Sequence, residues 1–316
     1  KVQYPGLAEV IDADFDNVVR MLVLARWVKA GRELDQWLED LRVQLHHEID
    51  YAREIAMTRK VAELVDASDA EVCRGGVRYR VPQLHDRYCS EQVIAMEYIE
   101  GHVVTQAEVA NLSQERRNAL GRSMLELFFY ELYHWGVLQT DPNFGNYLVR
   151  CDGAGDDAPL DELALLDFGS ILHCEDYFLD HLGNCISGGQ AGDRDLVADS
   201  LVGLDCLPQD ATQEARDLFT DFCMHLLEPL QPPEKLPPEY LNGKGEYCWA
   251  RSRLMSRAGK RAVASATSPH FTAPSREFAM IARKLTGVFT FISVLNAEFN
   301  AHDIVRGHIV RWAREH

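Results

Sequence analysis

Two kinds of hydrophobic pattern follow one another in the first third of the chain. Apolar residues recur every three or four positions in residues 16–28 and 33–62, which predicts helices. Residues 77–81 and 92–99 are short apolar runs bounded by Gly, Pro and Asp, a pattern typical of strands. The opening residues 1–6 close on a Pro-Gly pair, which predicts a strand end followed by a turn.

A long apolar segment begins the second part of the chain. Residues 112–135 are predicted to form a buried helix that leads into a loop at residues 139–146. Two apolar runs follow, at 147–149 and 163–166, joined by a Gly- and Asp-rich connection. They are predicted to be buried strands that pair as a hairpin.

Strand alternation is absent after the second of these runs. A proline-rich break occupies residues 231–238, and an apolar-striped helix is predicted at residues 277–296. A small mixed lobe followed by a mostly helical lobe fits this order of patterns. We therefore predict an α+β, bilobal fold, with residues 1–101 as the N-terminal lobe and residues 102–316 as the C-terminal lobe.

Composition and charge narrow the possible partners. The chain has 316 residues, of which 47% are hydrophobic, enough to bury a substantial core. A formal net charge of −17 argues against a nucleic-acid partner, because phosphate backbones are bound through clustered Lys and Arg. No run reaches the ~18 consecutive apolar residues that a membrane-spanning helix needs. We therefore predict that the given segment is soluble. A targeting or anchoring segment could precede Lys1 in the protein, and the prediction does not extend to such a segment.

Cysteine and histidine spacing gives no sign of a metal site. The eight cysteines include no C-x-x-C pair, and we predict that they are reduced thiols in a reducing compartment. His46 and His47 lie beside Glu48, but no H-E-x-x-H spacing accompanies them. A zinc-type site is therefore not predicted.

Three features with the chemistry of phosphoryl transfer occur in kinase order. They are Lys1 at a strand end, Asp141 and Asn146 in the loop after the apolar helix, and Asp167-Phe168-Gly169 after a buried strand. Phosphoryl transfer needs a cation on the nucleotide phosphates, metal ligands and an acid that aligns the acceptor. Each Asp alone is more often a turn residue or a helix cap, and an Asp-Phe-Gly tripeptide alone is weak evidence because it also arises by chance. Their order and context together favour a nucleotide site.

Two further segments complete the predicted site. Residues 96–99 resemble a kinase hinge, in which Met96 limits the adenine pocket and the Glu97 carbonyl and Ile99 amide face the base. A helical carboxylate must pair with Lys1 in such a site. Asp50 and Glu54 are one helical turn apart, so one of them is expected to face inward.

These segments together resemble the UbiB family, the aarF-type atypical kinases linked to ubiquinone and other prenyl-lipid metabolism. Residues 1–6 resemble its lysine strand, and Glu48-Ile49-Asp50 with Glu54 resembles its E-x-D helix. Residues 139–146 resemble its catalytic loop, usually written H-x-D-P-H-P-G-N, and Asp167-Phe168-Gly169 completes the set. The helix at 278–295, with Arg-Lys-Leu at 283–285, is also similar to a late helix of the family.

The resemblance implies a protein-kinase-like fold and a role for each motif residue. Lys1 would contact the nucleotide phosphates, with Glu54 as its salt-bridge partner. Asn146 and Asp167 would ligate Mg²⁺, and Asp141 would be the catalytic-loop acid.

The E-x-D residues Glu48 and Asp50 would belong to an extension that folds over the site and restricts access for protein substrates. The family's K-x-G-Q helix and its nucleotide loop would precede Lys1. Gln139, Asn143 and Phe144 stand where many members carry His, His and Pro.

The function that follows is Mg²⁺-dependent ATP binding with ATPase or small-molecule phosphotransferase activity in support of prenyl-quinone biosynthesis. Expected partners are ATP or ADP, prenyl-quinone precursors, lipid-pathway enzymes and a peripheral membrane contact, with the bacterial cytoplasm favoured and an organelle open. Two alternatives remain open: an aminoglycoside- or choline-type phosphotransferase, and a pseudokinase that binds nucleotide and organises other enzymes. The opening residues and the E-x-D helix argue against the phosphotransferase.

Overall fold

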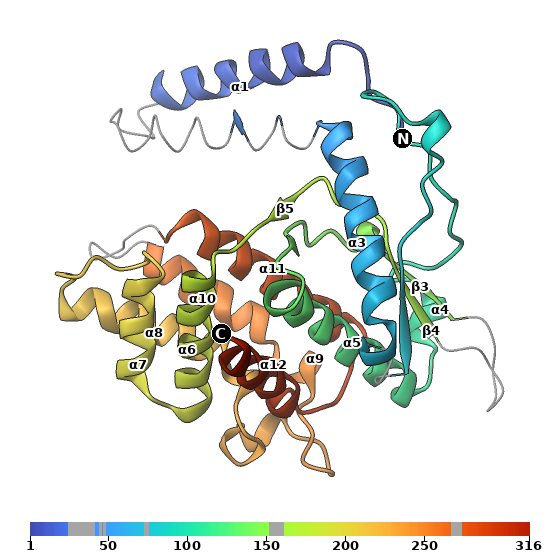
Figure 1. Cartoon of the computed structure of the whole chain (residues 1–316). Helices are drawn as coiled ribbons and strands as arrows, with labels where there is room; N and C mark the ends of the chain where they lie inside the picture. The colour runs from blue at the N-terminus through green and yellow to red at the C-terminus, as the bar shows by residue number, and fades with distance from the viewer. Residues whose placement is uncertain (25–41, 44–45, 47–48, 73–75, 152–160, 267–273) are drawn as a thin grey trace. The chain divides into compact units, whose positions relative to one another are not determined.

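The computed structural model describes residues 1–24, 42–43, 46, 49–72, 76–151, 161–266 and 274–316 (Figure 1). The chain divides into two compact units. The smaller unit comprises Lys1–Ala67, Val81–Ile99 and Leu166–Ile171, and the larger comprises Ser68–Arg80, Glu100–Leu165 and Leu172–His316.

Helices of the smaller unit begin at turn and cap residues. Helix α1 (Leu7–Leu24) starts directly after Gly6, whose φ of +73° suits glycine in the turn. The sequence pattern placed its start at residue 16, which was nine residues too late, and residues 25–28 of the predicted helix lie outside the described residues. Helix α3 (Tyr51–Val72) begins after Asp50 and runs on into the larger unit. Much of the helix predicted over residues 33–62 lies outside the described residues.

Short antiparallel ladders make up the β-structure of the smaller unit. The main chain of Lys1 exchanges two hydrogen bonds of 2.9 Å with Ile94, and Val2 bridges Val93. Leu84 bridges Met96 on the same segment. Residues 92–99 therefore pair through isolated bridges and do not form the regular strand that was predicted, because each pairing extends over only a few residues.

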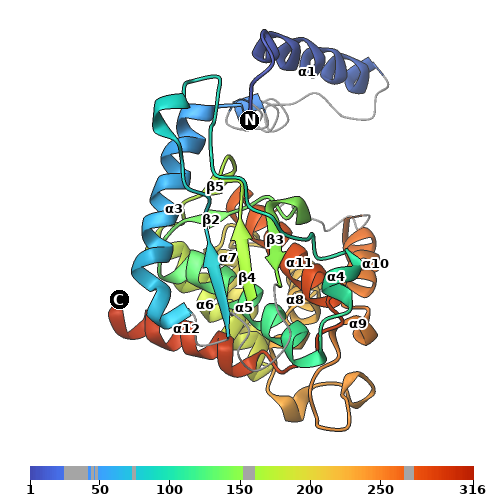
Figure 2. The same ribbon diagram turned by 90° about the vertical axis from the view of Figure 1, so that its right-hand side faces the viewer.

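A three-stranded sheet organises the larger unit. Its order is β1 (Val77–Arg80), β4 (Asp161–Leu165) and β3 (Tyr147–Arg150), with β4 in the middle (Figure 2). Strand β4 is antiparallel to β3, which confirms the predicted hairpin, and parallel to β1.

Helix α5 (Gln114–Tyr133) is the predicted apolar helix, and it begins where Ser113 Oγ accepts a hydrogen bond from the Arg116 amide. Arg116 then forms a two-pronged ion pair with Asp161, the first residue of β4. The pair ties the first turn of α5 to the start of the central strand.

Helix α11 (Arg276–Val294) packs against α5 and carries the predicted apolar stripe. Ile281, Leu285, Val288 and Ile292 recur at helical spacing and are all buried. The proline-rich break is a series of short 3₁₀ turns, as Pro at the start of each turn favours.

The remaining helices of the described residues are α4 (Ala107–Ala110), α6 (Asp176–Ala191), α7 (Arg194–Gly203), α8 (Gln213–Leu226), α9 (Trp249–Ser252), α10 (Leu254–Ala266) and α12 (His302–Glu315). The short elements are β2 (Leu138–Gln139), β5 (Ile171–Leu172), η2 (Asp86–Tyr88), η3 (Phe144–Asn146), η4 (Glu228–Leu230), η5 (Pro233–Lys235) and η6 (Pro238–Tyr240).

Mostly helical structure with small sheets agrees with the predicted α+β class. The seven cysteines within the described ranges are free thiols. None of the described helices is long and apolar enough to cross a membrane. The lobe boundary at residue 101 stays a prediction.

Candidate functional site

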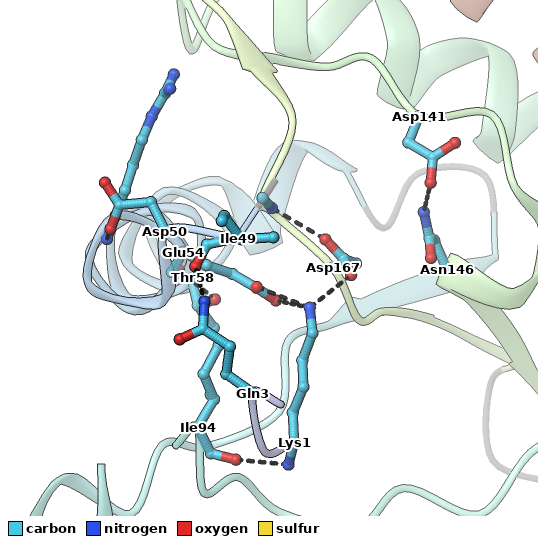
Figure 3. Close-up of polar contacts among 12 residues, drawn as sticks. Lys1, Gln3, Ile49, Asp50, Glu54, Thr58, Ile94, Asp141, Asn146 and Asp167 are labelled. Atoms are coloured by element: carbon cyan, nitrogen blue, oxygen red, sulfur yellow. Dashed lines mark hydrogen bonds and ion pairs between the residues drawn. The ribbon is translucent and has the colours of Figure 1, made fainter. Parts of the chain in front are cut away.

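Two carboxylates of the smaller unit contact the Lys1 ammonium. Its Nζ lies 2.8 and 2.7 Å from the two carboxylate oxygens of Glu54 and 3.1 Å from Oδ2 of Asp167 (Figure 3). Only 1% of the Glu54 side chain is exposed, against 37% for Lys1 and 35% for Asp167. A buried carboxylate therefore fixes a lysine whose other face reaches solvent beside a second carboxylate.

The charges of this cluster shift the titration of its members. Burial tends to lower the pKa of Lys1, but its contacts with Glu54 and Asp167 outweigh burial and raise the pKa. Burial and the nearby charge of Asp167 raise the pKa of Glu54, while Lys1 opposes that rise. The ammonium is thus held in its charged form, as a partner for anions must be.

Local contacts explain why Glu54 faces inward. Asp50 Oδ1 accepts a hydrogen bond of 3.0 Å from the Arg53 amide and caps the N-terminus of α3. The exposed Asp50 and the buried Glu54 thus have different surroundings although they are one turn apart. Gln3, two residues after the lysine, donates to the Ile49 carbonyl at 2.8 Å and ties the lysine segment to the start of α3.

Asp167 is fixed by the turn that follows it. Its Oδ1 accepts a hydrogen bond of 2.9 Å from the Gly169 amide, and Phe168 is buried. A Cβ on Gly169 would lie 3.3 Å from Asp167 Oδ1, a tight contact that a larger residue would worsen. The Asp-Phe-Gly sequence therefore orients one carboxylate oxygen and leaves the other at the lysine.

Asp141 and Asn146 meet in the larger unit. Asn146 Nδ2 donates to Asp141 Oδ2 at 2.8 Å (Figure 3). Arg283 Nη2 lies 3.4 Å from Asp141 Oδ1. Asn143 Oδ1 accepts a hydrogen bond of 2.9 Å from the Gly145 amide, so this residue, which replaces the usual His, caps the turn η3. The loop is held by its own polar side chains.

The predicted hinge residues are within the described part of the chain, whereas one of the two E-x-D residues is not. Met96, Glu97 and Ile99 end the paired segment of the smaller unit, where the Glu97 amide donates to the Gln83 carbonyl at 2.8 Å. Glu48 lies outside the described residues. The roles assigned to the hinge and to the E-x-D residues stay predictions.

Helix α11 contributes contacts that the motifs did not identify. Arg283 pairs with Asp141, and Lys284 Nζ lies 2.6 Å from Gln139 Oε1. The family resemblance identified residues 283–285 only as part of a helix similar to a late helix of the UbiB family. The sequence did contain one sign of these contacts. Lys284 is at a position that continues the apolar stripe of the helix, and a lysine that is buried in this way needs polar partners.

Comparison with known proteins identifies the family. Residues 1–201, more than half of the chain, match the ABC1 atypical kinase-like domain. The chain belongs to the ABC1 atypical kinase-like family. This result confirms the UbiB-type resemblance of the motifs.

Several full-length relatives of this ABC1-family chain are similar over nearly all of it. It is 29% identical over 314 residues to the rat protein "Atypical kinase COQ8B, mitochondrial", covering 99% of this chain and 54% of the relative. It is 28% identical over 298 residues to "Atypical kinase coq-8, mitochondrial" of Caenorhabditis elegans, covering 94% of this chain and 36% of the relative. The chain thus spans about half the length, or less, of these curated relatives.

A solved structure supports the kinase-like fold of the family. A Mycobacterium tuberculosis protein, Rv3197, solved in complex with erythromycin, superposes with a TM-score of 0.66 at 21% identity. The match covers 96% of this chain and 69% of that protein. The likeness shows the fold and nothing about the ligand.

The residues of this ABC1-family chain fit a magnesium–nucleotide ligand. Mg²⁺ prefers oxygen ligands and is typically held by one or two carboxylates together with substrate phosphates. Asp167 offers a partly exposed carboxylate, and Asn146 uses its Nδ2 for Asp141, which leaves Oδ1 as its ligating atom. Within the described residues no cluster of three or more His, Cys, Asp or Glu could hold a metal ion alone. Carboxylate and amide oxygens of this kind suit a metal whose other ligands are phosphates.

Proposed function

We propose that the chain is the core of an atypical kinase-like ATPase or phosphotransferase that binds Mg²⁺ and ATP and supports ubiquinone or other prenyl-lipid biosynthesis. The observation that carries the proposal is the Lys1–Glu54–Asp167 cluster, in which a buried carboxylate holds a partly exposed lysine beside a candidate metal ligand. The names of the relatives, which are atypical kinases, support the same class of activity.

Each side chain has a distinct task in this proposal. Lys1 neutralises the nucleotide phosphates, and Glu54 keeps its ammonium in position. Asp167 and Asn146 hold Mg²⁺, which neutralises charge on the transferring phosphoryl group. Asp141 aligns the acceptor hydroxyl or water, and its contact with Asn146 ties it to the metal-binding residue.

Other parts of the proposal rest on the family resemblance. Met96, Glu97 and Ile99 receive the adenine base, and Glu48 and Asp50 belong to the extension that limits access for protein substrates. Prenyl-quinone precursors, lipid-pathway enzymes and a peripheral membrane contact are the proposed partners, with the bacterial cytoplasm as the proposed location. The relatives with printed locations are mitochondrial or chloroplastic.

The test is turnover by the full-length protein. ATP hydrolysis is measured with Mg²⁺, with and without a prenyl-phenol headgroup analogue and liposomes, for the wild type and Asp167→Asn. We expect headgroup-stimulated hydrolysis that is lost in Asp167→Asn. Nucleotide binding without turnover under every condition would instead support the pseudokinase alternative.

A further inference from the structure

Helix α11 carries a buried lysine directly beneath the catalytic loop. Only 1% of Lys284 is exposed, and it continues the apolar stripe of the helix. Its Nζ lies 2.6 Å from Gln139 Oε1, contacts the Tyr147 hydroxyl and is 3.9 Å from Glu131 Oε2. Burial lowers the pKa of the Lys284 ammonium, while the charges of Glu131 and Asp141 oppose the fall.

The two close partners of this lysine stand at the two ends of the loop. Gln139 is two residues before Asp141, and Tyr147 follows Asn146 directly. The Tyr147 hydroxyl also donates to Gln139 Oε1 at 2.8 Å, so the three groups close a triangle. A single buried ammonium therefore connects the start of the loop to its end.

Electrostatics fixes the orientation of Gln139. A buried cation requires acceptors, because desolvation without them is costly. Gln139 Oε1 meets that need, whereas the opposite amide orientation would point its NH₂ group at the ammonium. Gln139 Nε2 is buried with no hydrogen-bond partner in the described part of the chain, which indicates that the demand of Lys284 outweighs that of the amide nitrogen.

Besides the pair of Arg283 with Asp141, the same helix contacts the loop at two further points. A Cβ on Gly287 would lie 2.2 Å from Pro142 Cβ, so the helix backbone approaches the loop as closely as glycine permits. The rings of Phe291 and Phe144 are edge to face at 6.0 Å. These contacts align α11 along the loop between the two ends that Lys284 joins.

We propose that Lys284 is a positioning residue for phosphoryl transfer, whose buried ammonium holds Gln139 and Tyr147 and thereby sets the geometry of Asp141 relative to Asn146. The catalytic part of this inference rests on the proposed ATP-dependent function. The effect on the loop itself does not depend on turnover.

The experiment separates loop positioning from charge balance in the full-length protein. Lys284→Met removes the ammonium and leaves Glu131 buried without a cation. The double variant Glu131→Gln/Lys284→Met also replaces this ionisable carboxyl by a neutral amide, whose oxygen can still accept the hydrogen bond that Glu131 receives from the Gln139 backbone. Leu285→Ala, at the next position, which is also buried, is the control: Leu285 lines a core cavity with residues such as Phe128 and Leu182 and with none from the loop, so the variant loses core packing there. Four quantities are measured: Tm, kcat, KM for ATP, and amide hydrogen exchange in residues 138–147.

We expect Lys284→Met to lower kcat by at least about tenfold, as a small misplacement of catalytic groups does, with KM for ATP changed less than about twofold. Exchange in residues 138–147 should accelerate. In the double variant Tm should recover while kcat stays low and exchange stays fast. Leu285→Ala should lower Tm and leave kcat and exchange in this segment near wild type.

Recovery of kcat together with Tm in the double variant would overturn the proposal, because it would reduce Lys284 to charge balance. Unchanged exchange in residues 138–147 of Lys284→Met would overturn it as well. If the wild type binds ATP without turnover, the proposed ATPase activity fails, and the exchange measurement alone decides the role of Lys284.

Discussion

At the scale of single residues, the pairing of Glu54 with Lys1 makes a sharp prediction. Glu54→Gln keeps the shape of the side chain but removes the charge that holds the ammonium. A hydrogen bond to a charged group contributes roughly 1.5–3 kcal/mol. We therefore expect kcat/KM for ATP to fall by about tenfold or more.

The matched control is Glu63→Gln, the same substitution on an exposed position of the same helix α3. It should leave kcat/KM within about twofold of the wild type, because it removes no contact with the lysine. Equal losses in both variants would contradict the assigned pairing. Steady-state hydrolysis at several ATP concentrations is the measurement.

Glu131 predicts a pH dependence of stability. Burial raises its pKa to about 7 from 4.5, against the opposing charge of Lys284, so the folded state binds this proton more tightly than the unfolded chain. The resulting stability is complete below about pH 4.5 and is lost as pH rises through about 7.

Relative to Glu131→Gln, which does not titrate, the wild type should lose up to roughly 3 kcal/mol of unfolding free energy between about pH 5 and about pH 8. Denaturant unfolding of both proteins across this range gives the difference. A difference that does not change with pH would show that Glu131 has an ordinary pKa.

At the residue level, the sequence motifs indicated the candidate site residues but not the contacts between positions that are far apart in the chain. Lys1, Asp141, Asn146 and Asp167 came from motif order, and helical spacing indicated that one of Asp50 and Glu54 faces inward. The pairing of Lys284 with Gln139 joins positions 145 residues apart. No local periodicity encodes such a contact, because it depends on how α11 packs against the loop.

At the scale of elements, the contact of α11 with the loop makes Gly287 sensitive to any side chain. Gly287→Ala would place a Cβ 2.2 Å from Pro142 Cβ. We expect a loss of about 1–3 kcal/mol of stability, as for an overpacked core, together with a lower kcat.

Gly259→Ala on α10 is the corresponding control, because nothing lies within 4 Å of the added Cβ. Alanine favours a helix interior over glycine by about 1 kcal/mol, so this variant should match or exceed the wild type in stability. Thermal unfolding and ATP hydrolysis are measured for both. Equal behaviour of the two alanines would contradict the close approach of α11 to the loop.

Elements were predicted well where the apolar pattern was continuous and buried, and less well in the smaller unit, where the start of α1 was misplaced. The apolar helices α5 and α11 and the β3–β4 hairpin followed the predicted patterns closely. Residues 92–99 have strand-like composition, but their partners at Val2 and Leu84 lie on short separate segments. Composition indicates β-structure there, whereas the length of a strand is set by its partners.

At the scale of the whole molecule, sequence order and family membership agree on an α+β kinase-like fold. The chain spans about half the length of the first relatives that it matches. Ligand binding stabilises the folded state and therefore raises Tm. The free energy of unfolding increases by about 2.7 kcal/mol when the nucleotide concentration is 100 times its Kd. We expect this rise with ATP and Mg²⁺ together, and a smaller one when EDTA removes the metal.

The central claim is that Lys1, Glu54 and Asp167 serve a magnesium–nucleotide site. Calorimetric titration of ATP into the full-length protein, with and without Mg²⁺, tests it most directly in the wild type, Asp167→Asn and the exposed control Asp210→Asn. We expect Mg²⁺-dependent binding that Asp167→Asn weakens by at least about tenfold and Asp210→Asn leaves unchanged. Equal ATP affinity in the wild type and Asp167→Asn, or an ATP affinity that does not depend on Mg²⁺, would show that Asp167 does not hold a magnesium–nucleotide ligand.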